Sequence, residues 1–223
     1  NSNDTILYAG GQFISINSGQ VRNYLVAINT SDGTVTSFNP NPNDTVYSLV
    51  LSSDSTTLYT GGYFTSMGGQ ARNRIAAINT LNGSVSSFDP NSDGTVYNLA
   101  LASDNSVLYV GGYFSEINSS SNNNAAAIQT STGVVTNFNL ASNDGVYTLA
   151  LSSDNNSLYI GGSYYLAGFT SYAPLAPSSL YLDSATENTI TIGWVDNSED
   201  EDSFTVEQSL DGENFTDPVV LAP

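Results

Sequence analysis

The sequence of 223 residues contains no lysine, no histidine and no cysteine. Without these residue types, a serine nucleophile has no ordinary base and the usual zinc sites cannot form. The absence of cysteine also excludes a disulfide framework, so cysteine pairing gives no information about the compartment. We therefore expect a protein that is not an enzyme and needs no cofactor.

Basic residues are nearly absent as well. Arg22, Arg72 and Arg74 oppose 21 acidic residues, which gives a net charge of −18. Such a polyanion repels nucleic acid and anionic membrane surfaces. No apolar run approaches the roughly 20 residues of a membrane helix, and the chain begins at Asn1 instead of a methionine, as expected after removal of an export signal. We expect an extracellular or cell-surface protein that neither binds nucleic acid nor inserts into a membrane.

The acidic residues are distributed unevenly along the chain. Residues 1–173 carry ten acids and three arginines, whereas residues 174–223 carry eleven acids and no base. The run Ala-Pro-Leu-Ala-Pro at 173–177 is typical of a short, semi-rigid linker. The sequence therefore predicts a first domain at 1–170, a linker at 171–178 and a second domain at 179–223.

A long-period repeat dominates the first domain. The run Leu-Tyr-x-Gly-Gly begins at Leu7, Leu58, Leu108 and Leu158, at spacings of 51, 50 and 50 residues. A period of this length is typical of propeller blades or solenoids. Paired glycines also occur in phosphate-binding loops, but such a loop needs a lysine and a following helix, and the sequence indicates neither. We therefore interpret the glycines as sites of close backbone approach.

Each repeat contains four short segments that are rich in β-branched and aromatic residues and are bounded by turn-forming residues, a pattern that predicts strands. The third segment (Ile75–Thr80) and the fourth (Ser84–Phe88) are joined through Asn-Gly, which favours a tight antiparallel hairpin. The first segment, Thr95–Leu101, is apolar on both faces and should lie between layers. Its alternation predicts one buried face that carries Tyr47, Tyr97, Tyr147, Leu49, Leu99 and Leu149.

Four antiparallel strands per repeat describe a blade of a β-propeller. The run Leu-Tyr-x-Gly-Gly-x-Phe, the loop Gly-Gln-x-Arg-Asn at Gly19–Asn23 and Gly69–Asn73, and the strand Ala-Ala-Ile-Asn-Thr resemble delta-60 repeats over residues 5–165. The resemblance implies β-propellers in large secreted bacterial proteins, with no general enzymatic activity. The third repeat departs from the pattern, since Ser119–Asn124 replaces the loop motif.

The repeats add up to about 3.5 blades, fewer than a closed propeller needs. We expect uncovered apolar faces at both ends of the array, and partners that are other parts of the parent polypeptide or further copies of the chain. An extracellular protein or a glycan is a further expected partner.

The second domain shows strands with a period of two residues at Ser179–Leu182, Thr189–Trp194 and Ser203–Gln208. These strands and the Ala-Pro-Ser entry resemble the N-terminal part of a fibronectin type III domain, a β-sandwich. The resemblance implies that Trp194 is a core residue, and sugar stacking is the alternative. The acidic run Asp196–Asp202 is predicted to be a solvated loop, with calcium binding as the alternative.

Several residues are candidate ligands. Asp89, Asn91 and Asp93 match the first half of a calcium loop, although Ala100 stands where the loop needs its last ligand, and turn chemistry is the simpler explanation. Glu116 is the only glutamate in the repeats and is interpreted as a solvated loop residue. The three arginines either grip an anionic ligand or bridge to a carboxylate or carbonyl of a neighbouring repeat.

The sequence favours a non-catalytic structural or adhesin-like interaction module of a large secreted or cell-surface bacterial protein. The alternative is a carbohydrate-binding accessory module of a secreted hydrolase. Exposed aromatic side chains on one face would distinguish this alternative, and the candidates are Tyr24, Tyr63, Tyr113 and Tyr164. A propeller enzyme would need carboxylates that converge without structural partners, whereas the repeated aspartates are expected to be turn residues: Asp44, Asp54, Asp93, Asp104, Asp144 and Asp154.

Overall fold

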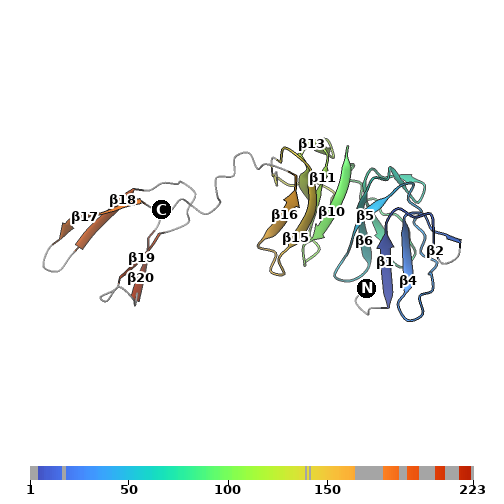
Figure 1. Cartoon of the computed structure of the whole chain (residues 1–223), viewed down its shortest axis with the longest axis horizontal. Coiled ribbons are helices and arrows are strands. Elements are labelled where there is room, and N and C mark those ends of the chain that lie inside the picture. Colours follow the sequence, from blue (N-terminus) through green and yellow to red (C-terminus); the bar gives the residue numbers. More distant parts are fainter. Residues whose placement is uncertain are drawn as a thin grey trace. The chain divides into compact units, whose positions relative to one another are not determined.

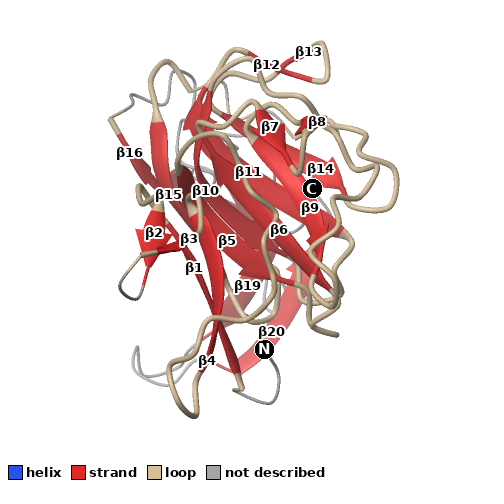
Figure 2. Ribbon diagram, turned by 90° about the vertical axis from the view of Figure 1, so that its right-hand side faces the viewer, coloured by secondary structure: helices blue, strands red, loops and turns tan. Residues whose placement is uncertain are grey.

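The computed structural model describes residues 5–16, 19–138, 140 and 142–163 in full, and the backbone of the strands at 178–185, 190–195, 204–208 and 216–221. Every regular element in these residues is a β-strand, as Figure 2 shows. The chain divides into two compact regions, Asn1–Ala167 and Gly168–Pro223. The prediction of an all-β fold is therefore confirmed for the described residues, none of which forms a helix that could cross a membrane.

Four sequence repeats follow one another in the N-terminal region: repeat 1 (5–38), repeat 2 (45–88), repeat 3 (95–138) and repeat 4 (145–163). Repeats 2 and 3 each form a three-stranded antiparallel sheet, in the orders β5-β6-β9 and β10-β11-β14, whereas repeats 1 and 4 show the pairs β1-β4 and β15-β16 (Figure 1). The strands are β1 (Ile6–Gly10), β4 (Leu25–Asn29), β5 (Val46–Leu51), β6 (Thr57–Gly62), β9 (Ile75–Asn79), β10 (Thr95–Leu101), β11 (Val107–Tyr113), β14 (Ala125–Gln129), β15 (Val146–Leu151) and β16 (Leu158–Gly162).

The fourth segment of each repeat is shorter than the sequence predicts. It turns back antiparallel to the third strand as expected, but the pairing is reduced to single bridges, such as Ile78 with Val85. The turn glycine has a positive φ in all three repeats that contain it, for example 72° at Gly83. Glycine adopts this conformation without steric cost, which explains the hairpin.

A short hairpin that the sequence did not predict lies between the second and third strands. It is formed by β2 (Ser15–Ile16) with β3 (Gln20–Val21), β7 (Ser66–Met67) with β8 (Gln70–Ala71), and β12 (Glu116–Ile117) with β13 (Ser120–Ser121). In repeat 2 its turn is Gly68-Gly69, and in repeat 3 Asn118-Ser119 adopts positive φ values of 51° and 60°. The altered motif of repeat 3 therefore preserves the hairpin.

The predicted burial of the inner-strand tyrosines is wrong. The register of β10 on β11 shifts between Val96 and Asn98, so Tyr97 forms a β-bulge, and the same shift occurs in β5 and β15. A bulge adds one residue to the alternation. Val96 and Leu99 are consequently both buried, whereas Tyr47 and Tyr147, which occupy the bulge in β5 and β15, are 52% and 47% exposed.

In repeats 1, 2 and 3, the first glycine of the pair lies where adjacent repeats touch. A Cβ atom on Gly61 would come within 2.6 Å of Val96 Cγ1 and 3.2 Å of Leu99 Cγ in the next repeat. Gly111 meets Val146 at 2.7 Å in the same way. Real Cβ atoms do not approach so closely, and the predicted role of these glycines as sites of close approach is confirmed.

The hydrophobic core lies between the repeats. One cluster joins Leu25 and Phe38 of repeat 1 to Leu58 and Phe64 of repeat 2, and a second joins repeat 2 to repeat 3. Hydrogen bonds also join repeats 2 and 3. Ser48 Oγ accepts from the Leu99 amide at 3.0 Å, and the side chains of Asn105 and Ser53 pair at 2.7 Å.

The C-terminal region contains two antiparallel pairs. β17 (Ser178–Ala185) pairs with β18 (Ile190–Val195), and β19 (Phe204–Gln208) pairs with β20 (Thr216–Leu221). Trp194 lies in β18, but the predictions for its burial and for the acidic run Asp196–Asp202 concern features outside the described residues.

Candidate functional site

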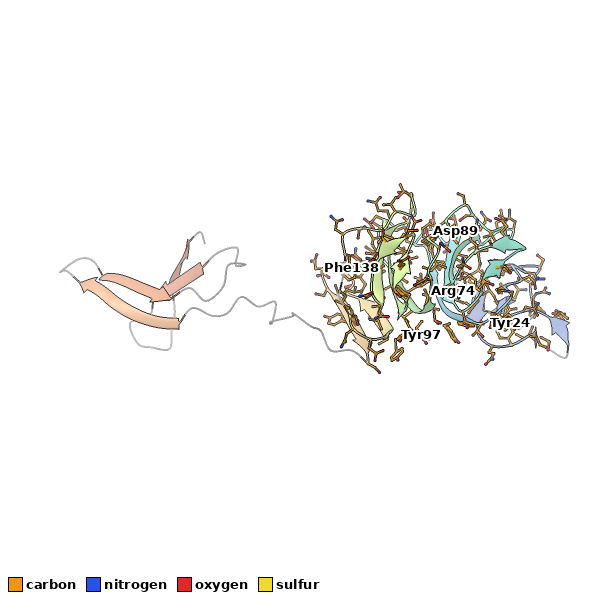
Figure 3. The ribbon with its side chains drawn as sticks, turned by 90° about the horizontal axis from the view of Figure 1, so that it is seen from above. Tyr24, Arg74, Asp89, Tyr97 and Phe138 are labelled. Atoms are coloured by element: carbon orange, nitrogen blue, oxygen red, sulfur yellow. The ribbon has the colours of Figure 1, made fainter. Side chains whose placement is uncertain are left out.

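A row of three tyrosine rings crosses the inner strands of repeats 2, 3 and 4. The ring centroids of Tyr47 and Tyr97 are 5.7 Å apart, and those of Tyr97 and Tyr147 are 5.2 Å apart. Figure 3 marks Tyr97, the middle ring, at the margin of the repeat array. The three bulges turn these rings away from the core between the repeats, and we call this surface the tyrosine row.

A second aromatic position lies where the second strand ends. Tyr113 is the last residue of β11 and is 60% exposed, and Tyr63 occupies the equivalent place in repeat 2 and is also exposed. The guanidinium carbon of Arg74 lies 5.9 Å from the centroid of the Tyr63 ring, which is cation–π geometry. Tyr24 is partly buried, and Tyr164 lies outside the described residues.

Tyr113 lies beside a cavity. This cavity has a volume of about 450 Å³. The lining residues are Asp93, Gly94, Tyr113, Phe114, Ser115, Asn123, Asn124 and Asn143. Among them Asp93, Tyr113, Ser115 and Asn123 have exposed side chains, whereas Phe114 and Asn124 are buried. The volume lies within the range of small-molecule sites. We call this space the Tyr113 cavity.

The three calcium candidates, Asp89, Asn91 and Asp93, each interact with different partners. Asp89 forms an ion pair with Arg72 at 3.6 Å, and Asn91 Oδ1 accepts a hydrogen bond from Asn73 at 2.6 Å. Asp93 Oδ1 accepts from the amides of Ser115 and Glu116 at 2.9 and 3.0 Å. Within 5–16, 19–138, 140 and 142–163, no group of three or more acidic, histidine or cysteine residues is placed to hold a metal. Calcium binding at this loop stays a prediction.

The arginines bind within their own repeat, which corrects the expectation that they bridge to a neighbouring one. Arg22 donates to the carbonyl of Thr36 at 2.7 Å, and Arg72 donates to the carbonyl of Ser86 at 2.6 Å. Both carbonyls belong to the fourth segment of the same repeat. Arg22 and Arg72 therefore each bind the fourth segment of their own repeat, whereas Arg74 packs on the ring of Tyr63. Glu116 has an exposed side chain, as predicted.

The aspartates at the turn after the first strand have structural partners. Asp104 Oδ1 accepts from the amide and the hydroxyl of Ser106 at 2.9 and 2.7 Å, and Asp54 makes the same contacts with Thr56. Hydrogen bonds from side-chain hydroxyls and backbone amides lower the pKa of Asp54, Asp104 and Asp154. These carboxylates are turn residues, as the sequence predicts.

No protein-family profile matches the sequence, and a search of curated proteins also found no match.

Sequence reasoning named Tyr113 and Asp93 but did not bring them together. It interpreted Asp93 as a turn residue, with calcium binding as the alternative, and gave no role to Asn124 or Gly94. A signal was present for Gly94, because it stands where repeats 2 and 4 have Asp44 and Asp144. A residue that differs from its counterparts in the other repeats can indicate a binding site when it lies beside other candidate ligands in the structure.

Proposed function

We propose that this chain is a non-catalytic interaction module of a large secreted or cell-surface bacterial protein, built from β-propeller blades of the delta-60 type and part of a fibronectin type III domain. The observation that carries the proposal is the tyrosine row. Exposed aromatic side chains are enriched at protein interaction surfaces, because each ring contributes a large contact area at a low cost in side-chain entropy.

The geometry of the bulge does not by itself require tyrosine at these three positions. The bulge directs the side chain outward, where a small polar residue would satisfy the backbone equally well. Tyr47 and Tyr147 nevertheless expose about half of their surface, and Tyr97 joins them into one patch. Contiguous exposed aromatic surface is typical of a binding site.

The non-catalytic part of the proposal is supported by the residue inventory. The chain has no histidine, lysine or cysteine to act as a base or nucleophile. The carboxylates of Asp54 and Asp104 are occupied by turn hydrogen bonds, and that of Asp89 pairs with Arg72. Each of these three carboxylates therefore has a structural partner, as a turn residue or in an ion pair.

A carbohydrate-binding accessory module is the second candidate function. The Tyr113 cavity favours it, because the cavity combines an exposed aromatic ring with amide and carboxylate groups. Such a mixture of apolar surface and convergent polar groups is typical of small-molecule sites.

The experiment compares the full chain with the variant Tyr47→Ser/Tyr97→Ser/Tyr147→Ser, each on fluorescent beads. Retention is measured on fibronectin-coated, collagen-coated, cellulose and xylan surfaces. The matched control is Tyr159→Ser, which removes an exposed tyrosine outside the row. We expect at least one surface to retain the native chain and the control but not the triple variant. Absence of retention on every surface, or equal retention of all three proteins, would contradict the proposal.

A further inference from the structure

Repeats 2 and 3 offer an internal comparison at the end of the second strand. Tyr63 and Tyr113 occupy the same place in the repeat, and both are exposed. The residue that faces the ring differs. Arg74 lies against Tyr63, whereas repeat 3 has the shorter Asn124 in that position. Asn124 is buried and points into the protein, where it accepts from the amide of Phe114 at 3.1 Å and donates to the carbonyl of Ser142 at 3.2 Å.

The floor of the Tyr113 cavity is shaped by a glycine. Gly94 replaces Asp44 of the preceding repeat, and a Cβ atom at position 94 would collide with the carbonyl oxygen of Tyr113 and approach Phe114 Cα to 2.8 Å. The missing side chain lets the start of β10 approach the end of β11 closely. Asn124, which is shorter than Arg74 and bonds inside the protein, leaves the Tyr113 ring without the cation that lies against Tyr63.

Polar groups in the cavity remain available. Both recorded hydrogen bonds of Asp93 use Oδ1, which leaves Oδ2 without a partner among the described residues. In the same part of the chain, the Tyr113 hydroxyl and the Asn123 side-chain amide also have no hydrogen-bond partner, and both side chains are exposed. The cavity therefore offers one carboxylate acceptor, one amide that donates and accepts, and one hydroxyl next to an aromatic face.

We infer that the Tyr113 cavity binds a neutral saccharide. A pyranose ring has apolar C–H groups on its face, which pack on an aromatic ring, and hydroxyls at its edge, which pair with carboxylate and amide groups. The charge of the site selects against acidic sugars, because Asp93 and the adjacent Glu116 are both negative and the chain carries 21 acids against three bases. A cation fits poorly, because Asp93 contributes the only carboxylate in the lining.

The inference rests on the proposed function in one respect, namely that the module works by binding extracellular material. It goes further by naming the site and the ligand class. It also assigns different roles to two equivalent tyrosines, since Tyr113 binds sugar whereas Tyr63 is occupied by its own arginine.

The test uses the full chain and saturation-transfer NMR with glucose, galactose, mannose, xylose and cellobiose, together with glucuronate and adenosine. We expect one or more neutral sugars to bind. The variant Tyr113→Ser should weaken that binding by about tenfold or more, because the ring supplies the apolar contact. The variant Asn123→Ala should weaken it by a smaller factor, because it removes one donor and one acceptor.

Tyr63→Ser is the matched control, because it removes an exposed tyrosine at the equivalent place in repeat 2 and should leave sugar binding unchanged. Since all three substituted side chains are exposed, the variants should keep the native circular dichroism spectrum. The inference is overturned if no neutral sugar binds, if Tyr113→Ser binds as the native chain does, or if glucuronate or adenosine binds equally well.

Failure of this inference is separable from failure of the proposed function. Retention on protein-coated surfaces that depends on the tyrosine row, without any sugar binding, would overturn the saccharide site and support the interaction module. Sugar binding that is lost in Tyr113→Ser, without retention through the tyrosine row, would support the saccharide site and contradict the proposed role of the tyrosine row.

Discussion

The middle and the two ends of the repeat array carry the same motif in different surroundings. In repeat 2, Leu58 packs toward repeat 1 and Tyr59 packs toward repeat 3, so that only 7% of Tyr59 is exposed. At the ends, Leu7 of repeat 1 is 56% exposed and Tyr159 of repeat 4 is 64% exposed. Among the residues that the structure describes, no neighbouring repeat covers either of these two side chains.

This difference shows that burial in the array is supplied by the neighbouring repeat. The same residue in the same strand is core or surface according to what lies beside it, as in other linear repeat arrays. Burial raises the pKa of Tyr59, whereas a hydrogen bond with Thr130 of the next repeat lowers it. The open faces support the proposal that further repeats or copies pack on this chain.

The largest expected effect is a difference in stability loss between two leucines that occupy the same position of the repeat. Leu108→Ala should lower the free energy of unfolding by about 2–5 kcal/mol, because Leu108 is fully buried between repeats 2 and 3. Leu7→Ala should change it by about 0.5 kcal/mol or less, because Leu7 is exposed. Urea denaturation followed by far-UV circular dichroism measures both. Equal losses of stability for the two variants would contradict the conclusion that burial is supplied by the neighbouring repeat.

A smaller effect is expected from filling the space at the glycines. Gly111→Ala should destabilise the protein by about 1–3 kcal/mol, since its Cβ would lie 2.7 Å from Val146 and 3.1 Å from Leu149. Gly11→Ala is the control, because its Cβ would meet only Phe13 at an ordinary 3.4 Å. Thermal unfolding of both variants tests the interface, and an unchanged melting temperature for Gly111→Ala would argue against close packing there.

The ring contacts of the tyrosine row should contribute less to the free energy of unfolding than the buried core residues do. Tyr97 has a ring neighbour on each side, whereas Tyr147 has one within the row. Since an aromatic pair contributes about 0.5–1.5 kcal/mol, Tyr97→Ala should cost about twice as much from ring contacts as Tyr147→Ala. A double-mutant cycle on Tyr97 and Tyr147 measures their coupling directly. A coupling energy of zero would mean that the rings do not touch in solution.

The smallest expected effect is on how the stability of the protein depends on pH in the acidic range. Hydrogen bonds lower the pKa of Asp104 below the ordinary value of 3.8, so the folded state holds the proton more weakly than the unfolded state does. The stabilisation is therefore present above pH 3.8 and is lost as the pH falls through the folded-state pKa. Asp104→Asn should flatten the decline of stability in that range. An unchanged pH profile would mean that the turn hydrogen bonds do not form.

Much of the fold was predictable because its signals are local. The alternation of residues such as Ile75–Thr80 predicted strands, Asn-Gly at 82–83 predicted a hairpin, and Gly61 predicted a close approach. The extent of the fourth segment was not predictable, because its residues favour a strand whereas its backbone pairing in repeats 1, 2 and 3 is a single bridge. The short hairpins were missed because two-residue strands have no recognisable period.

The candidate site was predicted only in part. Tyr63 and Tyr113 were identified as exposed aromatics, but the sequence did not distinguish them, since the difference lies in what faces each ring. The tyrosine row was placed in the core, because strict alternation puts Tyr97 on the same side as Leu99. The bulge breaks that alternation.

By itself, the sequence determined the all-β class, the period of the repeats and the positions of the turns, because these depend on the conformational preferences of a few adjacent residues. Only the tertiary structure decided which face of each inner strand is buried, where the arginines bind and which tyrosine adjoins a cavity. These features depend on packing between repeats that are about 50 residues apart. The residues beside the bulge of one repeat, such as Val96 and Leu99, occupy the space that a glycine of the preceding repeat, Gly61, leaves free.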